Sequence, residues 1–279
     1  MTRLTPEDLR GIPAGLEAYD ATLKARTGCA LRELACRAAG TTEARLVELA
    51  GPARVAVVPL DAGQGVLPGF AEAVRAIAAH LGFPAWVTAA PDAGGLAEAY
   101  RRGAGILVTA DDSRYIAVNL RSRAVADNNR STALGFITAL GLLAGGLAGR
   151  PVLVLGCGPV GREAARLLRG RAAQVSLCDL QVDRAREAAA ALAAEAPAAG
   201  PVRIEEDLEE ALRGHRLLFD ATPTPAFILE RHLHPETRIA APGVPLGLSA
   251  KALRAAGPRV VHDRLEIGTA VMLLEALLS

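Results

Sequence analysis

This chain of 279 residues has few aromatic residues, almost no net charge and no long apolar run. Charges and glycines interrupt the apolar residues, so no run approaches the roughly 20 residues that span a bilayer. The first ten residues, MTRLTPEDLR, lack the apolar core of a secretory signal. A formal net charge of +1 argues against a nucleic acid or another polyanion as partner. We therefore expect a cytoplasmic protein that binds neither membranes nor nucleic acids.

Cysteine is also rare. The four cysteines are Cys29, Cys36, Cys157 and Cys178, and their spacings match no zinc-binding pattern. We expect them to be reduced and buried, and we expect no metal site.

One stretch of the chain has the pattern of a strand, a glycine-rich turn, a helix and a second strand. Its turn carries Gly156, Gly158 and Gly161 in the spacing GxGxxG. In this motif the first glycine permits a tight turn, the second lets backbone approach a pyrophosphate, and the third lets helix and strand pack closely. The helix N-terminus, with Pro159 and Val160 in its first turn, offers free N–H groups to phosphates. The stretch predicts a Rossmann dinucleotide-binding domain.

An acid follows the second strand of this unit. Asp179 lies about 20 residues beyond the glycines, where a carboxylate accepts hydrogen bonds from a ribose 2′-hydroxyl. A carboxylate repels the 2′-phosphate of NADP, so Asp179 favours NAD as cofactor. Arg184 lies nearby and leaves NADP as an alternative.

The alternation of strand and helix patterns indicates an α/β fold with parallel sheets. We expect a small α/β substrate domain over 1–146, a Rossmann domain over 147–264 and a C-terminal helix over 265–279 that packs back at the domain interface. In the first half, the patterns predict strands at 54–60, 85–89, 106–110 and 115–120, and helices from Thr5 through Tyr19 and at 31–39, 70–81, 94–103 and 133–147. In the second half, they predict strands at 152–155, 175–178, 202–204, 217–220, 237–240 and 259–262, and helices at 182–194, 208–213 and 265–278.

Acidic residues follow several strands of the first half. Asp61, Asp92, Asp111 and Asp112 all come just after a predicted strand. Because ligands of open parallel sheets collect at the carboxyl ends of the strands, this cluster suits a cationic substrate. The alternative for each acid is a solvated loop or a helix cap, and it is stronger for Asp92 and Asp112.

A run of six polar residues, 127–132, precedes the long apolar helix that leads into the nucleotide domain. Asp127 or Asn128 is expected to cap that helix. Capping explains one polar residue of the six, so the run predicts an interdomain cleft at this point. In the nucleotide half, loops that follow strands predict further cofactor contacts at Ala221, Thr222, Pro223, Pro242, Gly243 and, at the start of the last helix, Gly268.

Lysine is almost absent, since Lys24 and Lys251 are the only two. This weighs against shikimate-type and amino-acid-dehydrogenase-type sites, which rely on a lysine in the substrate domain. His80 lies in a helix pattern, and His232 and His234 are most simply surface residues.

The side chains that remain for chemistry are Asp61, Asp111, Asn128 and Thr132. Carboxylate, amide and hydroxyl groups of this kind bind ammonium groups and orient an amine for hydride loss. No strong base is evident, so we expect the amine to lose its proton to water.

Several stretches together resemble one known family. They are LTPEDL (4–9), VVPLDAGQGVLPGF (57–70), LGFPAWVTAAPDAGG (81–95), TADD (109–112), NL (119–120), DNNRST (127–132), LGCGPVG (155–161), DATPTP (220–225), PGVP (242–245) and LEIGTAVML (265–273). Over nearly its whole length the chain resembles the PylD family, the NAD-dependent dehydrogenases that complete pyrrolysine biosynthesis. The N-terminal stretches and LEIGTAVML are the most specific.

The resemblance implies a reaction. The substrate would be 3-methyl-D-ornithine joined through its carboxyl to the side-chain nitrogen of L-lysine. NAD would take hydride from the carbon bearing the terminal amine of the ornithine part. The α-amine of that part would capture the imine or aldehyde, ammonia would leave, and a methyl-pyrroline ring would close to give pyrrolysine.

The resemblance also implies which residues contact the substrate. These are Leu4, Leu60, Asp61, Ala110, Asp111, Asn128 and Thr132. The first helix would close over the substrate and place Leu4 against it, although Leu4 also fits as a hydrophobic staple for that helix. Asp111 would bind an ammonium group, and we assign catalytic roles to Asp111 and Asn128. Asp61 stands where the family has a small hydroxyl residue, and an acid there could still bind the same amine.

Two other functions stay open at this stage. The first is another NAD-dependent enzyme with the same two-domain plan, acting on a different amine, an amino acid or a small hydroxy acid. The second is a sensor or scaffold that binds NAD without catalysis, which the row of carboxylates disfavours. We expect a homodimer, from the prevalence of two-fold symmetry and from the resemblance.

Overall fold

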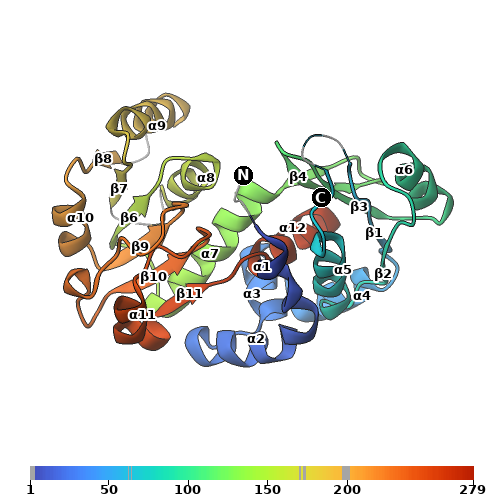
Figure 1. The fold of residues 1–279 in the computed structure, drawn as a ribbon, viewed down its shortest axis with the longest axis horizontal. Coiled ribbons are helices and arrows are strands. Elements are labelled where there is room, and N and C mark those ends of the chain that lie inside the picture. Colours follow the sequence, from blue (N-terminus) through green and yellow to red (C-terminus); the bar gives the residue numbers. More distant parts are fainter. Residues whose placement is uncertain (1–3, 62, 64, 170, 172–173, 197–201) are drawn as a thin grey trace.

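The computed structural model describes residues 4–61, 63, 65–169, 171, 174–196 and 202–279. It shows two β-sheets covered by helices and joined by one long helix, α7 (Asn128–Ala144) (Figure 1). The α/β class predicted from the sequence is confirmed, whereas the domain limits stay a prediction. Within the described ranges, no helix is both long and apolar enough to cross a bilayer.

The first sheet has the strand order β2-β1-β3-β4-β5. Its strands are β1 (Val55–Val57), β2 (Ala85–Val87), β3 (Ile106–Ala110), β4 (Tyr115–Asn119) and β5 (Val125–Asp127). The expectation of a wholly parallel sheet is wrong here, because β4 runs antiparallel to both β3 and β5. Only residues 111–114 connect β3 to β4, and a parallel crossover needs a dozen residues or more. The double reversal brings the end of β5 back to the edge where β1 and β3 end.

Among the residues that the structure describes, six helices precede α7. They are α1 (Pro6–Arg10), α2 (Ile12–Thr27), α3 (Leu31–Ala38), α4 (Glu43–Ala50), α5 (Phe70–His80) and α6 (Asp92–Arg101). Thr5 caps α1, and its hydroxyl accepts from the backbone N–H of Asp8 while the Asp8 carboxylate accepts from the Thr5 backbone. The single helix expected from Thr5 through Tyr19 is divided at Gly11, because Pro13 has no N–H to donate to the preceding turn.

The second sheet is parallel throughout, with the order β11-β10-β9-β6-β7-β8. Its strands are β6 (Pro151–Leu155), β7 (Gln174–Cys178), β8 (Val202–Ile204), β9 (Leu217–Asp220), β10 (Arg238–Ala241) and β11 (Val260–His262). The connecting helices are α8 (Pro159–Leu168), α9 (Val182–Glu195), α10 (Leu208–Gly214), η1 (Glu230–His232), α11 (Ala250–Ala256) and η2 (Gly257–Arg259). The strand order reverses between β6 and β9, which is the point where such sheets bind ligands.

The two sheets are held together by α7 and by the C-terminal helix α12 (Glu266–Leu278), which pack closely on each other (Figure 1). A β-carbon on Gly135 would collide with Ile267 and lie 3.0 Å from Val271. Asp127 caps α7, so the helix begins five residues earlier than its apolar pattern indicates. This earlier start places the polar residues 128–132 on the first turns of the connecting helix.

The close packing of α7 on α12 predicts opposite effects for two glycines of the same helix. Gly135→Ala is expected to lower the free energy of unfolding by about 1–3 kcal/mol, because its methyl group overpacks the contact with Ile267. Gly141→Ala is the matched control, because its β-carbon would lie at an ordinary 3.6 Å from Leu147. Since alanine favours the helix more than glycine does, this variant is expected to raise the free energy of unfolding by up to about 1 kcal/mol. Urea unfolding of both variants measures this, and equal effects would contradict the packing argument.

Candidate active site

The glycine-rich turn after β6 forms a close backbone cradle. Gly156 has a φ of 86°, and a β-carbon there would lie 3.1 Å from the carbonyl oxygen of Ala221. A β-carbon on Gly161 would collide with the carbonyl of Gly156, whereas one on Gly158 would meet nothing within 4 Å. Backbone therefore fills the turn on one side and leaves Gly158 open at the N-terminus of α8. These features fit a dinucleotide pyrophosphate.

Asp179 lies directly against this turn. Its Oδ2 accepts a hydrogen bond from the backbone N–H of Cys157 at 2.7 Å, and its Oδ1 accepts from Gln181 at 2.9 Å. Each carboxylate oxygen keeps a lone pair, so the half-buried side chain can still accept from ribose hydroxyls. The structure thus brings the acid and the glycines together.

The loops after β9 and β10 are organised by a residue that sequence reasoning missed. Oδ1 of Asp220 accepts from the backbone N–H of Thr222 at 3.1 Å and from its hydroxyl at 2.7 Å. The backbone carbonyl of Asp220 accepts from Gly243 at 3.0 Å. Burial raises the pKa of the Asp220 carboxyl to about 6. The available signal was an acid at the end of an apolar strand, LLFD, with no polar neighbour before it.

These contacts stack the predicted cofactor residues of the two loops on each other. A β-carbon on Gly243 would collide with the carbonyl of Thr222. Pro242 and Gly243 are buried, Ala221 and Thr222 are half-buried, and Pro223 is exposed. The loops stand at the carboxyl edge of the sheet, beside the glycine-rich turn.

Asn128, Thr132 and Gly268 meet where α7 crosses α12. The Thr132 hydroxyl donates to Oδ1 of Asn128 at 3.1 Å, and a β-carbon on Gly268 would lie 3.1 Å from Nδ2 of Asn128. That Nδ2 is buried and has no acceptor among the described residues. Because an unsatisfied buried donor is costly, an oriented amide of this kind points to a ligand that accepts from it.

Asp111 forms the turn between β3 and β4. Its Oδ1 accepts from the backbone N–H groups of Ser113 and Arg114, each at 2.7 Å, and these bonds lower the pKa of the exposed carboxyl. Arg114 in turn pairs with Asp127 at 2.9 Å, one residue before Asn128. The turn therefore links Asp111 to the start of α7 through one arginine.

Of the other predicted acids, Asp61 and Asp112 lie on loops and Asp92 is the first residue of α6. Asp92 accepts from the backbone N–H of Asp61 at 3.0 Å, and Asp112 lies against Gly63. This hydrogen bond joins the start of α6 to the loop after β1. Ala62, in the same loop, is outside the described residues.

The apolar substrate candidates lie at the margins of the core. Leu4 and Ala110 pack against the main cluster, and Leu60 packs against a small cluster that includes Val58. The α1 helix next to Leu4 is tied to the segment after β11, since Arg264 Nε lies 3.0 Å from the Asp8 carboxylate. The N-terminal helix therefore reaches the nucleotide half.

The expectation for His232 is wrong. It is only 3% exposed, because its Nδ1 accepts from the backbone N–H of Leu229 and its Nε2 lies 3.0 Å from a Glu209 oxygen. His234 is exposed, as expected, and His80 pairs with Asp20 at 2.7 Å.

The four cysteines are free and buried, as predicted. No group of histidine, cysteine and acidic residues within the described ranges has the arrangement of a metal site.

The parallel second sheet and its glycine cradle define a protein with a Rossmann-type dinucleotide-binding fold, and polar groups gather at the α7–α12 crossing. Residues 8–126 match the family model "Pyrrolysine biosynthesis protein PylD, N-terminal domain", and residues 124–221 match "Alanine dehydrogenase/PNT, C-terminal domain". A pyrrolysine synthase from Methanosarcina acetivorans is 30% identical over 284 residues, which cover 99% of this chain and 100% of that protein. The chain belongs to the pyrrolysine synthase (PylD) family.

Solved structures share the fold at low sequence identity. A shikimate dehydrogenase in complex with NADP⁺ has a TM-score of 0.55 at 10% identity, covering 80% of this chain and 89% of that one. A quinate dehydrogenase from Corynebacterium glutamicum in complex with NAD has a TM-score of 0.52 at 14% identity, covering 80% and 92%. Both cofactors thus occur on this fold.

The buried acid Asp220 predicts a pH dependence of stability. Its pKa is about 6 in the folded protein and 3.8 ordinarily, so between these values the folded state holds a proton that the unfolded state has lost. Stability therefore falls as pH rises from 4 to 6, by up to about 3 kcal/mol for a shift of this size. Asp220→Asn keeps the acceptor for Thr222 and is expected to remove this fall.

Urea unfolding of wild type and Asp220→Asn at pH 4.5 and pH 7 measures the difference. The exposed Asp183→Asn is the control. A difference between Asp220→Asn and wild type that is the same at both pH values would show that Asp220 does not titrate in this window.

Proposed function

We propose that this protein is an NAD-dependent amine dehydrogenase that oxidises the terminal amine of 3-methyl-D-ornithyl-N6-L-lysine and yields pyrrolysine. Membership of the pyrrolysine synthase family supports the substrate. The observation that carries the proposal is the buried Nδ2 of Asn128, oriented by Thr132 beside Gly268. A donor held in this way suits the amide carbonyl in the middle of the substrate.

The acid in the β3–β4 turn is proposed to bind the ammonium group. Backbone donors keep the Asp111 carboxyl ionised, and they occupy Oδ1, so Oδ2 is left for the substrate. Asn128 and Thr132 hold the polar groups further along the molecule. Leu4 and Leu60 supply apolar surface that excludes water from the reacting carbon.

The residues of the nucleotide half fit a dinucleotide. The glycine cradle and the N-terminus of α8 would hold the pyrophosphate, Asp179 the adenosine ribose, and the stacked loops at Thr222 and Gly243 the nicotinamide end. When bound, the nicotinamide supplies an acceptor for the hydride that leaves the carbon bearing the amine.

Ring closure needs little from the protein. After oxidation, the α-amine of the ornithine part attacks the new C=N carbon of the same molecule, and ammonia leaves. Such intramolecular attack has a high effective concentration, so positioning is enough. We also propose a homodimer and a cytoplasmic location for the enzyme.

Turnover of the dipeptide tests the proposed function. Purified protein with the methylornithyl-lysine dipeptide and NAD is expected to form NADH, followed at its absorbance band, and pyrrolysine, identified by mass. Asp111→Asn keeps the turn acceptor but removes the charge, and is expected to lower kcat/KM at least about 10-fold. The exposed Asp183→Asn is the control. If wild type forms NADH only with another amino acid or a hydroxy acid, the proposed substrate is refuted.

Asp179 predicts the choice of cofactor. Wild type is expected to have a kcat/KM at least about 100-fold higher with NAD than with NADP, because the carboxylate repels a 2′-phosphate. Asp179→Asn keeps an acceptor for the Cys157 N–H and is expected to narrow this ratio, mainly by improving NADP. Steady-state kinetics with both cofactors measures the ratio. A wild-type preference for NADP would contradict the assignment.

A further inference from the structure

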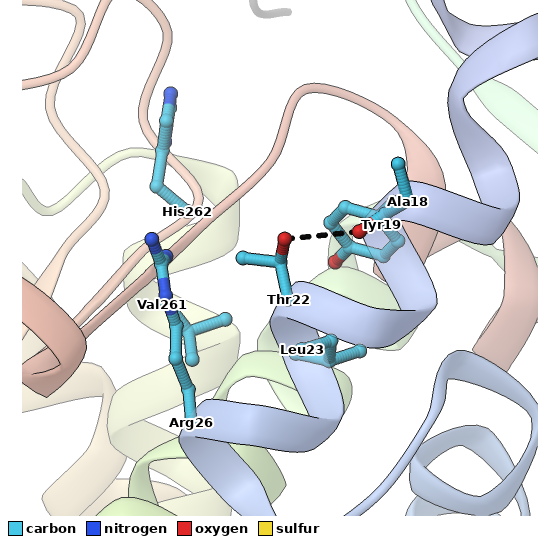
Figure 2. A pocket seen from close by; sticks show the side chains of 7 residues that line it. All are labelled: Ala18, Tyr19, Thr22, Leu23, Arg26, Val261 and His262. Carbon is cyan, nitrogen blue, oxygen red and sulfur yellow. Dashed lines mark hydrogen bonds between the residues drawn. The ribbon is translucent and has the colours of Figure 1, made fainter.

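A cavity of about 300 Å³ lies between α2 and the edge strand β11. Figure 2 shows Arg26 rising from α2 toward His262, with Thr22 across the space from both and Tyr19 one turn further along the helix. His262 ends β11, and its Nδ1 donates to the carbonyl of Ala241 at 2.7 Å. Because Ala241 directly precedes the Pro242–Gly243 loop, the cavity adjoins the loop assigned to the nicotinamide end.

Arg26 is a half-buried cation without an acidic partner among the described residues. One of its guanidinium nitrogens donates to the backbone carbonyl of Val260 at 2.8 Å. A guanidinium has five N–H donors in a fork that matches a carboxylate, so most of its donors remain available. A buried or half-buried arginine in this state suits an anionic ligand.

The open edge of β11 adds a second donor. Alternate residues of an edge strand turn their unpaired backbone groups to the same side. The backbone N–H of His262 therefore faces the side on which the Val260 carbonyl meets Arg26. On the opposite wall, the Thr22 hydroxyl donates to Ala18 at 2.9 Å and keeps lone pairs that can accept from an ammonium group. Donors on one wall and an acceptor on the other suit the head group of an amino acid.

Nearby acids do not neutralise Arg26. Asp8 is paired with Arg264 at 3.0 Å. Asp263 accepts from the Tyr19 hydroxyl at 2.6 Å, and burial raises the pKa of its carboxyl well above the usual range. Glu266 accepts from the backbone N–H of Leu265 at 3.0 Å. Within the part of the chain that the structure describes, none of these three acids forms an ion pair with Arg26.

We propose that this cavity binds the α-carboxylate of the lysyl part of the substrate, with Arg26 as its main contact. The proposal rests on the proposed function, in which Asp111 binds the ammonium group at the other end of the dipeptide and Asn128 contacts the amide in its middle. The lysyl part of that substrate ends in a second charged head, far from the reacting carbon, and a second polar site would add binding energy there. The position of the cavity between the N-terminal helices and the nucleotide half supplies one.

Kinetics of Arg26→Gln tests this site. The variant is expected to raise KM for the dipeptide about 10- to 100-fold with kcat within about twofold of wild type, because the contact is equal in the ground and transition states. Lys24→Gln is the control, since Lys24 is exposed on the same helix and does not line the cavity. The Kd for NAD and the thermal midpoint of Arg26→Gln are expected to match wild type.

An analogue in which 1,5-diaminopentane replaces lysine, and which therefore lacks the carboxylate, makes the test specific. Wild type is expected to have a higher KM for this analogue than for the dipeptide. Arg26→Gln is expected to raise the KM for the analogue no further. If Arg26→Gln raised the KM for both substrates by the same factor, or left the KM for the dipeptide unchanged, the carboxylate site would be refuted. The proposed function would stand in either case. A wild-type enzyme that does not oxidise the dipeptide would refute the proposed function and this site with it.

Discussion

The close crossing of α7 and α12 is the contact on which the arrangement of the molecule depends. At Gly135 the helices approach until a single added carbon would collide with Ile267, and at Gly268 the same holds for Thr132. A buried bond of 3.0 Å between Tyr115 and Thr269 then ties α12 to the first sheet. Since α7 runs from the end of β5 to the start of the second sheet, fixing it on α12 fixes one sheet relative to the other. The amide of Asn128 is therefore positioned by helix packing rather than by a loop.

The nucleotide half relies on close backbone approach as well, but an acid holds its loops. Gly156, Gly161 and Gly243 each bring backbone against backbone, which no larger residue allows. Asp220 joins the loops after β9 and β10 through its hydrogen bonds to Thr222 and Gly243. An ionised carboxyl in such a place is costly, and its raised pKa reflects that cost. The two loops predicted to contact the cofactor are thus held together by a carboxyl group whose ionised form is disfavoured by burial.

The sequence predicted helices, strands and turns well where a single local pattern determines the structure. The strand at 106–110 and the turn at Gly156–Gly161 follow directly from apolar runs and glycine spacing. The prediction failed where a distant or competing contact decided it. Pro13 divides a helix that the apolar spacing makes continuous, and the short 111–114 link forces an antiparallel strand. The burial of His232 depends on Glu209, a residue more than 20 positions away that no local pattern reveals.

The N-terminal helices form a second connection between the halves, distinct from α7. Three polar contacts reach β11 or the segment just after it: Asp8 to Arg264, Tyr19 to Asp263 and Arg26 to Val260. All three involve residues 260–264, so they join α1 and α2 to one short segment of the nucleotide half. The same strand end carries His262, whose Nδ1 donates to the carbonyl of Ala241 at the end of β10, next to the Pro242–Gly243 loop. If the substrate binds Arg26 as proposed, its contacts add to those that hold α2 against the nucleotide half.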